Sequence, residues 1–111
     1  MEIREVTHLE AALKVLGERQ KLLAHNLANV DTPGYRRVDV DFAEAFEAAL
    51  AGKSIPYHRE AATFYKPDGN GVDVDSEMAL LAETTLHYQS AAQMLSLALG
   101  RYQTAITGRS R

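Results

Sequence analysis

The chain has 111 residues, of which 46% are apolar, and its 12 basic and 15 acidic side chains give a net charge of −3. That length allows one small domain, and the apolar share excludes wholesale disorder. The negative charge offers no basic surface for nucleic acid, and without cysteine no disulfide can stabilise the fold.

A seven-residue repeat of apolar side chains fills the chain before Pro33. It predicts an amphipathic helix over residues 8–30 with a narrow apolar stripe. Thr7 and Glu10 have the spacing of a capping box, which places the start of the helix near His8, and the proline sets its end. The stripe consists of two interleaved series in which only glutamine is polar: Val6, Leu13, Gln20 and Leu27, and Leu9, Leu16, Leu23 and Val30.

The period changes between residues 31 and 73. Residues 35–40 alternate weakly and predict an extended stretch, after which Asp41 is placed to cap a short helix ended by Gly52. Residues 53–71 have turn chemistry without a firm period and predict a loop or a poorly formed hairpin. The expected short helix has one apolar face, made by Phe42, Ala45, Phe46, Ala49 and Leu50.

A second and longer heptad repeat predicts a helix over residues 74–107. Asp73 is placed to cap this helix and Gly108 to end it. Gly100 is expected to leave a soft point inside it, because glycine costs about 1 kcal/mol relative to alanine in a helix. The apolar stripe interleaves Val74, Leu81, Tyr88, Leu95 and Tyr102 with Met78, Thr85, Ala92, Leu99 and Ile106.

The expected fold is mainly α-helical, a single domain over residues 1–111 whose terminal helices form an antiparallel, coiled-coil-like hairpin. At about 1.5 Å per residue the helices would be roughly 34 and 50 Å long, so neither can cover the other completely. Two helices seldom bury enough apolar area to offset their ordering entropy, which favours burial against neighbouring subunits. The alternative is a small monomeric bundle with the short helix as third member, and periodicity alone does not decide between them.

A specific string joins the first helix to the middle segment. Its asparagines are poor interior helix residues but good donors and acceptors for a helix end, its Thr-Pro-Gly sequence turns the chain, and its tyrosine is a flat amphipathic anchor. The string therefore predicts a rigid elbow. It reads Asn26-Leu27-Ala28-Asn29-Val30-Asp31-Thr32-Pro33-Gly34-Tyr35 and continues as Arg36-Arg37-Val38-Asp39-Val40-Asp41-Phe42.

This string resembles the N-terminal signature of the bacterial flagellar axial proteins, the rod, hook and hook-associated family. Its continuation is most similar to the proximal-rod protein B branch of the flagellar basal-body rod proteins. A second stretch similar to this branch is Asp68-Gly69-Asn70-Gly71-Val72-Asp73-Val74-Asp75-Ser76-Glu77-Met78, followed by Leu86-His87-Tyr88-Gln89. Together the similar stretches cover about residues 6–42 and 68–107, most of the chain.

The resemblance implies a structural subunit of the proximal rod, which transmits torque and joins the membrane ring to the rest of the rod. The terminal helices would form the coiled-coil inner layer of a hollow tube. The implied partners are copies of the chain, other flagellar rod proteins, membrane-ring or export-gate adaptor proteins and the flagellar type III export machinery. The rivals are another flagellar axial protein and a helical adaptor that binds a partner helix without polymerising.

The implied location is the periplasmic rod of the basal body, reached by export without a cleaved signal peptide. Residues 1–10 carry acids where a secretory signal needs a basic start, and no apolar core follows them. The longest strongly apolar run, residues 78–82, is far shorter than the roughly 20 residues of a spanning helix. No direct membrane insertion is therefore expected.

The resemblance and the heptads together specify the expected functional residues. The elbow is expected to consist of Asn26, Leu27, Ala28, Asn29, Asp31, Thr32, Pro33, Gly34, Tyr35, Asp39, Asp41 and Phe42. The assembly seam is expected to consist of Val6, Leu9, Leu13, Leu16, Leu23, Leu27, Val74, Met78, Leu81, Tyr88, Leu95, Leu99, Tyr102 and Ile106.

No catalytic, cofactor or metal site is expected from the polar residues. The string that begins at Asp68 starts like a calcium loop, but Val72 and Ala79 stand where an EF-hand needs oxygen ligands. The histidines are scattered without metal-ligand spacing, and the carboxylates are explained by capping and solvation. The sequence therefore predicts no enzyme activity, no small-molecule substrate and no nucleic-acid partner. The residues weighed were His8, His25, His58 and His87, and Asp39, Asp41, Asp73, Asp75 and Glu77.

Overall fold

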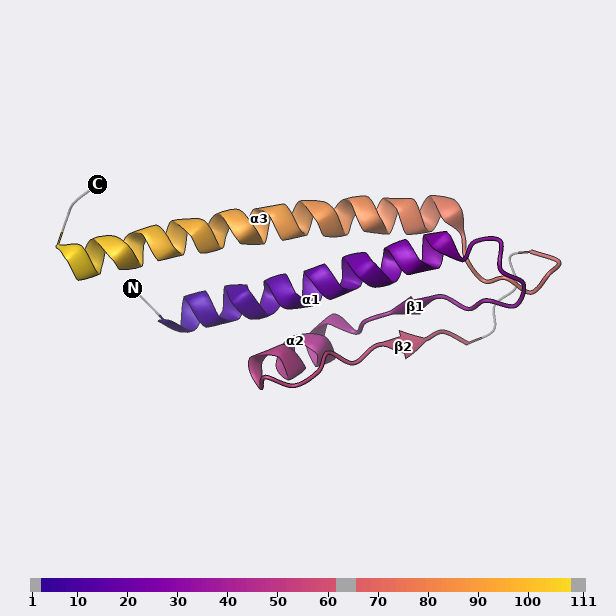
Figure 1. Ribbon diagram of the computed structural model, residues 1–111, viewed down its shortest axis with the longest axis horizontal. Helices are drawn as coiled ribbons and strands as arrows, with labels where there is room; N and C mark the ends of the chain where they lie inside the picture. The colour runs from indigo at the N-terminus through magenta and orange to yellow at the C-terminus, as the bar shows by residue number, and fades with distance from the viewer. Residues whose placement is uncertain (1–2, 62–65, 109–111) are drawn as a thin grey trace.

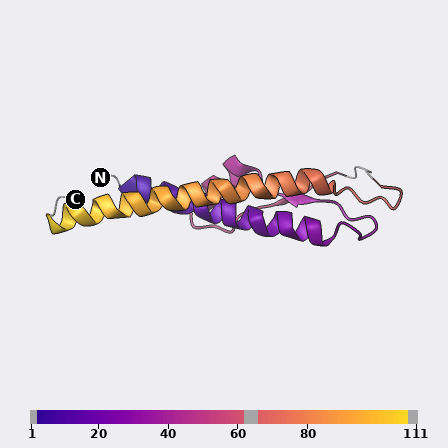
Figure 2. The same cartoon turned by 90° about the horizontal axis from the view of Figure 1, so that it is seen from above.

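A computed structural model describes residues 3–61 and 66–108 and shows an elongated, mainly helical hairpin (Figure 1). Helix α1 (Ile3–Ala28) and helix α3 (Val74–Thr107) lie side by side and run antiparallel. The Cα atoms span 64 × 25 × 15 Å. Because a helix with its side chains is about 10–12 Å across, the shortest dimension holds little more than one layer of helices (Figure 2).

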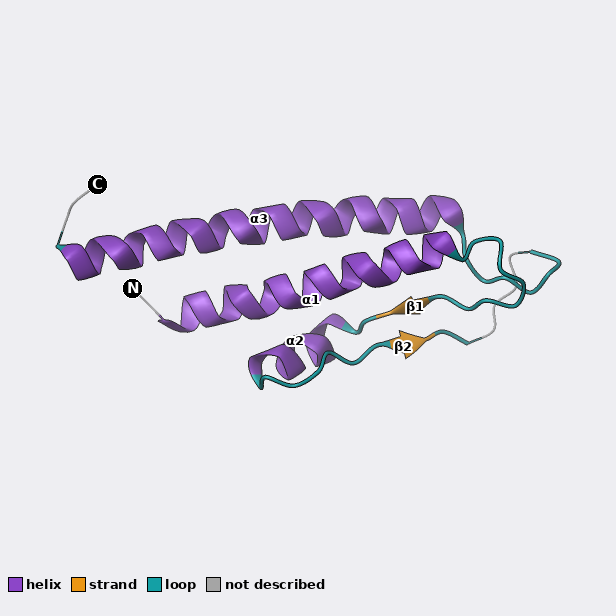
Figure 3. Cartoon of the chain, viewed as in Figure 1, coloured by secondary structure: helices purple, strands orange, loops and turns teal. Residues whose placement is uncertain are grey.

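The middle segment lies along α1 and consists of short elements joined by loops (Figure 3). These are strand β1 (Val38–Asp39), helix α2 (Phe42–Leu50) and strand β2 (His58–Arg59), and the two strands pair antiparallel with Val38 opposite Arg59. Helix α2 packs against α1, but in the described part of the chain it does not pack against α3. The three helices therefore do not close into a bundle, and α1 is the central element.

A small apolar core joins α1 to α2. Alanine predominates in it, which lets the two helices approach closely. As predicted, Asp41 caps α2 by accepting a hydrogen bond from the backbone N–H of Glu44 at 3.4 Å, and the helix ends just before Gly52, whose φ is +71°. The buried core residues are Ala11, Val15, Ala45 and Ala49, with Val40, Phe46 and Ile55 partly buried against them.

Small and polar side chains line the face of α3 that meets α1. Gln20 Nε2 on α1 donates a hydrogen bond to Thr85 Oγ1 on α3 at 3.0 Å. The ring of Tyr88 lies over Gly17, where an added Cβ would stand 3.6 Å from ring atom Cε2. The leucine-rich series of α3 consequently lies on the flanks of this contact. The buried residues of α3 recur every seven positions: Glu77, Thr84, Ala91 and Ala98.

Helix α1 begins at Ile3 instead of near His8, so the predicted capping box is wrong. Thr7 lies inside the helix, where its Oγ1 donates to the carbonyl oxygen of Ile3 at 3.1 Å. The additional turn lies against α3: Ile3 and Val6 face Leu99 and Tyr102, and Arg101 Nη2 donates to Glu5 Oε1 at 2.7 Å across the hairpin. Tertiary packing therefore extends the helix beyond its local start signal.

The remaining elements lie close to their expected positions. Helix α1 ends at Ala28 instead of near Val30, and α3 occupies the expected residues between its N-cap Asp73 and Gly108, which has a left-handed φ of +71°. The extended stretch forms β1 as expected. Its partner β2 comes from the segment without a firm period, and this pairing was not predicted.

Candidate assembly site

The elbow after α1 is a tight turn held by its own side chains. Asn29 Nδ2 donates to the carbonyl oxygen of His25 at 2.9 Å, and Asn29 Oδ1 accepts from Thr32 Oγ1 at 3.0 Å. Gly34 has a φ of +73°, a left-handed conformation that is strained for a residue with a Cβ. Residues within the turn therefore contribute to its conformation. Ala28, Asp31, Thr32, Pro33 and Gly34 are exposed around its tip.

Asn26 is fully buried and bonds to three separate segments. Its Nδ2 donates to the carbonyl oxygen of Val38 at 2.8 Å and its Oδ1 accepts from the N–H of Val38 at 2.9 Å, so the side chain pairs with that residue as a neighbouring strand would. The same Oδ1 accepts from Tyr35 OH at 2.8 Å, and Nδ2 also donates to Glu77 Oε2 at 3.1 Å. One side chain thus joins α1 to the elbow, β1 and the start of α3.

Asn70 is a second buried asparagine, and it bonds carbonyl groups of the turn that follows α1. Its Nδ2 donates to the carbonyl oxygens of Asn29 at 3.0 Å and Thr32 at 2.7 Å. Its Oδ1 accepts from the N–H of Val72 at 2.8 Å, which also shapes the approach to α3. The turn before α3 and the turn after α1 are therefore bonded to each other.

Backbone hydrogen bonds complete this junction. The N–H of Gly34 donates to the carbonyl oxygen of Asp68 at 3.0 Å, and the N–H of Gly71 donates to that of Tyr35 at 2.9 Å. The two sequence strings that share the family resemblance, residues 26–42 and 68–78, thus meet in space and form one structural unit.

A network of charged side chains continues the junction along β1. Arg37 bonds Glu77, which is buried, and Glu60, and its Nη2 lies 3.1 Å from Asp39 Oδ2. Arg19 of α1 holds the same aspartate with two bonds, at 2.9 and 3.1 Å. In the described residues no buried polar side-chain atom lacks a hydrogen-bond partner. The network therefore ties α1, β1 and α3 together without leaving a buried charge unpaired.

The electrostatics of the network keep its central groups ionised. Burial lowers the pKa of Arg37, but its bonds to Glu77, Glu60 and Asp39 outweigh burial and raise that pKa above its usual range. Burial raises the pKa of Asp39, but the bonds from Arg19 and from the N–H of Val40 hold the pKa of this carboxyl below its usual value. The ion pairs consequently persist at neutral pH.

Tyr35 anchors the elbow between a cation and another ring. The guanidinium of Arg59 lies 5.3 Å from the centre of its ring, and the ring of His25 meets it edge-on at 5.9 Å. Burial raises the pKa of the tyrosine hydroxyl, opposed in part by Arg59, so this hydroxyl remains the donor to Asn26. Phe42 differs from Tyr35, because it is 47% exposed and its ring stacks on that of Phe46, one turn later in α2, at 6.0 Å.

The structure divides the expected seam residues into an inner and an outer group. The outer group is exposed, from 37% for Val74 and Tyr102 to 67% for Ile106, and all of its members belong to α3. The inner group consists of the buried Leu16 and Leu23 and the half-buried Val6, Leu9, Leu13, Leu27, Leu81, Tyr88 and Leu95. The outer group consists of Val74, Met78, Leu99, Tyr102 and Ile106.

The free end of the hairpin, opposite the elbow, is apolar and incompletely packed. Here α3 extends past the start of α1 (Figure 1). A notch of about 180 Å³ lies between Ile3 and Val6 of α1 and Leu99 and Tyr102 of α3. Ile106 lies one turn further along α3 and is 67% exposed.

The model of a protein family described as "Flagella basal body rod protein" matches residues 8–36, which cover most of α1 and its elbow. The flagellar basal body rod protein FlgB of Escherichia coli is 31% identical, with 78% of this chain and 81% of the relative covered. The chain belongs to the flagellar basal body rod protein family. FlgB of Bacillus subtilis is 28% identical over 93% of each chain, and FlgB of Salmonella typhimurium is 29% identical over 89% of this chain and 90% of the relative. The rod protein is thus a structural component of the flagellar basal body.

Four residues that hold the rod protein's junction together were not expected to do so. Sequence reasoning treated Asn70 as turn chemistry and Glu77 as a charge at a helix start, and it gave Arg19 and Arg37 no role. One signal was available for the glutamate. It precedes Thr84, Ala91 and Ala98 at intervals of seven, and a heptad series of small residues marks a face of close helix contact.

The described residues of this rod protein provide neither a metal site nor a membrane-spanning helix. Within residues 3–61 and 66–108 no three acidic or histidine side chains are arranged so that they could hold a metal ion. None of the helices in the same ranges is long and apolar enough to cross a bilayer.

Proposed function

We propose that this rod protein is a structural subunit of the proximal rod, which assembles through its terminal helices, transmits torque and joins the membrane ring to the rest of the rod. One observation carries the proposal. The elbow end is held together by internal bonds, whereas α3 leaves a long series of large apolar side chains exposed. The similarity to proteins named FlgB supports a place in the rod.

The exposed apolar side chains are the physical reason for assembly. Burying one large apolar side chain contributes about 1.5–3 kcal/mol of stabilisation. Covering the exposed set with neighbouring molecules would therefore contribute a substantial free energy of assembly. A body only 15 Å thick has no interior in which to place them. The large exposed side chains of α3 are Val74, Met78, Leu86, Met94, Leu97, Leu99, Tyr102 and Ile106.

The two groups of seam residues have different proposed roles. The inner group holds the hairpin straight, and the outer group packs against copies of the chain and other rod proteins. The elbow sets the direction in which the middle segment leaves α1, so that this segment reaches an adjacent subunit or a membrane-ring or export-gate adaptor protein. Many such contacts in parallel resist twisting, which is what torque transmission requires.

The proposed role involves no chemical step. The chain is exported through the flagellar type III machinery and is placed in the periplasmic rod. Its function there is mechanical, and the buried charges of the junction are explained by their pairing.

Sedimentation of the purified chain with other rod components tests the proposal. A rod subunit adds to a growing complex whose mass rises with the amount supplied. A helical adaptor, the main rival, gives a small complex of fixed composition, and that result would remove the proposed role.

A deletion strain provides the cellular test. The chain is expressed in a strain that lacks its own proximal-rod B protein, and basal bodies are isolated and examined. We expect rods that contain the chain and restored swimming. If the chain is secreted but no rods form, the protein is not a rod subunit. If rods form but contain the chain only outside the proximal rod, the protein is a different axial protein.

A further inference from the structure

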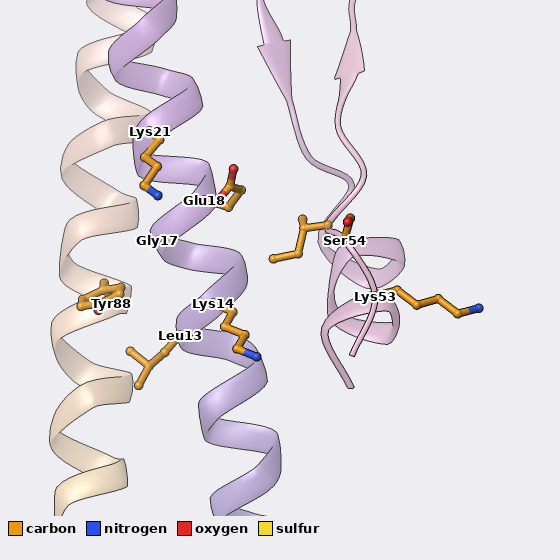
Figure 4. A pocket seen from close by; sticks show the side chains of 9 residues that line it. Leu13, Lys14, Gly17, Glu18, Lys21, Lys53, Ser54 and Tyr88 are labelled. Carbon is orange, nitrogen blue, oxygen red and sulfur yellow. The ribbon is translucent and has the colours of Figure 1, made fainter. Parts of the chain in front are cut away.

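An open groove of about 590 Å³ runs along α1, between α3 and the loop that follows α2 (Figure 4). Its floor is α1, where Gly17 lies between Lys14 and Lys21 in the sequence and beside the ring of Tyr88. Both lysines are exposed, and neither takes part in an ion pair within the described residues. Glu18 also lines the groove, whereas the side chain of Lys53 at the rim points away from α1 (Figure 4).

The walls of the groove are only partly apolar, and Ser54 also lines them. Leu13 of α1 and Tyr88 of α3 line it on one side (Figure 4), and Ile55, in the loop that follows α2, is its third apolar residue. An amphipathic helix with carboxylates along its edges would satisfy both the lysines and these walls.

The side of α3 that points away from α1 has the complementary pattern. Asp75, Ala79, Glu83 and Leu86 lie on one face, separated by four, four and three residues, and all are exposed. Leu86 is 63% exposed, although Thr84 on the opposite side of the helix is completely buried. No lysine or arginine occurs in α3 before Arg101, so this face is acidic over its first half.

The spacings of the two surfaces match. Lys14 and Lys21 are separated by about 10 Å along α1, and Asp75 and Glu83 by about 12 Å along α3. A small residue lies between the members of each pair, glycine in the groove and Ala79 on the acidic face.

We propose that the groove over α1 binds the acidic face of α3, residues 75–86, from a second copy of this chain. The proposal rests on the proposed rod function and specifies one of its subunit contacts. Asp75 and Glu83 pair with Lys14 and Lys21, while Leu86 packs against the apolar residues of the groove.

A second copy fits this groove because one chain carries both surfaces on different sides. The groove opens over α1, and the acidic face points away from α1, so each copy can bind one neighbour with each surface. The contact is heterologous, and such contacts build rings or helical tubes instead of closed dimers.

Charge reversal tests this contact. In the full chain, Lys14→Glu with Lys21→Glu, and separately Asp75→Lys with Glu83→Lys, should each weaken self-association by about tenfold or more, because like charges then face each other. Combining all four substitutions in one chain should restore it to within a few-fold of wild type. Concentration-dependent sedimentation measures each constant, and circular dichroism checks that each variant keeps its helix content.

Matched controls separate this contact from general charge effects. Arg36→Glu and Glu47→Lys change exposed charges outside both surfaces and should leave self-association unchanged. The neutral pair Asp75→Asn with Glu83→Gln alters the acidic face without placing lysine in the first turn of α3, and it should weaken association less than the reversal does.

Three results would overturn the inference: a wild-type chain that stays monomeric up to roughly 1 mM, a reversal without effect, or a fourfold variant that stays weak. If the chain nevertheless builds rods in the deletion strain, the groove binds another subunit and the proposed function stands. If self-association follows the charges but no rod contains the chain, the proposed function fails instead.

Discussion

The two ends of the helical hairpin are built on opposite principles. At the elbow end, two fully buried asparagines and a buried glutamate bond segments that are far apart in sequence, such as Asn26 with Glu77, 51 residues apart, and Asn70 with Asn29, 41 residues apart. At the free end, α3 extends beyond α1 and exposes Leu99, Tyr102 and Ile106. One end is complete in a single molecule, and the other is not.

The difference shows that the elbow end provides a specific geometry and that the free end provides apolar surface for binding. Directional hydrogen bonds require a defined geometry, so the elbow end can fix how the middle segment leaves the hairpin. Apolar contact is not directional and scales with area, which suits a surface that neighbouring molecules cover. Substitutions at the elbow end should therefore lower the stability of the lone chain, and substitutions at the free end should impair assembly.

The largest effect is expected from Asn26→Leu. Leucine fills a similar volume but leaves the N–H and C=O of Val38 buried without partners. It also removes the hydrogen bonds that Asn26 makes with Tyr35 OH and Glu77 Oε2. Each unsatisfied group costs about 1–3 kcal/mol, so the free energy of unfolding should fall by about 3–5 kcal/mol in a urea titration.

Asn29→Leu is the matched control for that experiment. It changes the same residue type one turn later, where the side-chain bonds are exposed and water can replace them, and it should cost about 1 kcal/mol or less. Equal losses in the two variants would show that the buried junction is not what holds the elbow end together.

Glu77→Gln is expected to have the next largest effect. The substitution keeps the shape but removes the negative charge that faces Arg37 inside the hairpin. Removing one partner of a buried pair leaves the other poorly compensated, and we expect a loss of about 2–3 kcal/mol in the free energy of unfolding.

Glu83→Gln, on the exposed side of the same helix, should stay within about 0.5 kcal/mol of wild type. The coupling to Arg37 can be measured with a double-mutant cycle. If the cycle shows no coupling energy, the ion pair does not stabilise the junction.

A smaller effect concerns acid stability. The pKa of Asp39 is lower in the folded chain than the ordinary value of about 3.9, so its bonds to Arg19 and Arg37 stabilise the fold above that pH. Stability from this group should decline as the pH falls through the ordinary value and below it, because the unfolded chain then binds more protons. Asp39→Asn should be less stable at neutral pH and should show a shallower fall in stability between about pH 5 and pH 3. An unchanged slope would contradict the assignment.

The smallest effect on the lone chain is expected at the free end. Ile106→Gln replaces an exposed side chain within α3, so the free energy of unfolding should change by no more than about 0.5 kcal/mol. Rod assembly and swimming should nevertheless be lost or strongly reduced, because the apolar surface is needed by the neighbouring subunit. Ile106→Leu keeps that surface and should swim. A motile glutamine variant would show that the exposed end of α3 is not part of the assembly seam.

Sequence periodicity predicted much of the architecture, because it depends on local spacing. Heptads specify helices, and the caps Asp41 and Asp73 specify where two of them begin, since both signals act within a few residues. The first helix shows the limit of such signals. A capping box suggested a start near His8, but the helix has an additional turn before it, which lies against α3.

The sequence by itself determined that two long amphipathic helices flank an irregular middle and that a turn follows the first of them. Only the tertiary structure decided which apolar series stays exposed. The face of α3 that packs most closely on α1 carries the small residues Thr84, Ala91 and Ala98, and most of the leucines lie beside or away from it. The tertiary structure also decided that Asn26, Asn70 and Glu77 belong to one junction. Hydrogen bonds between residues so far apart in sequence leave no periodic trace, since each depends on a single pair of positions brought together when the hairpin closes.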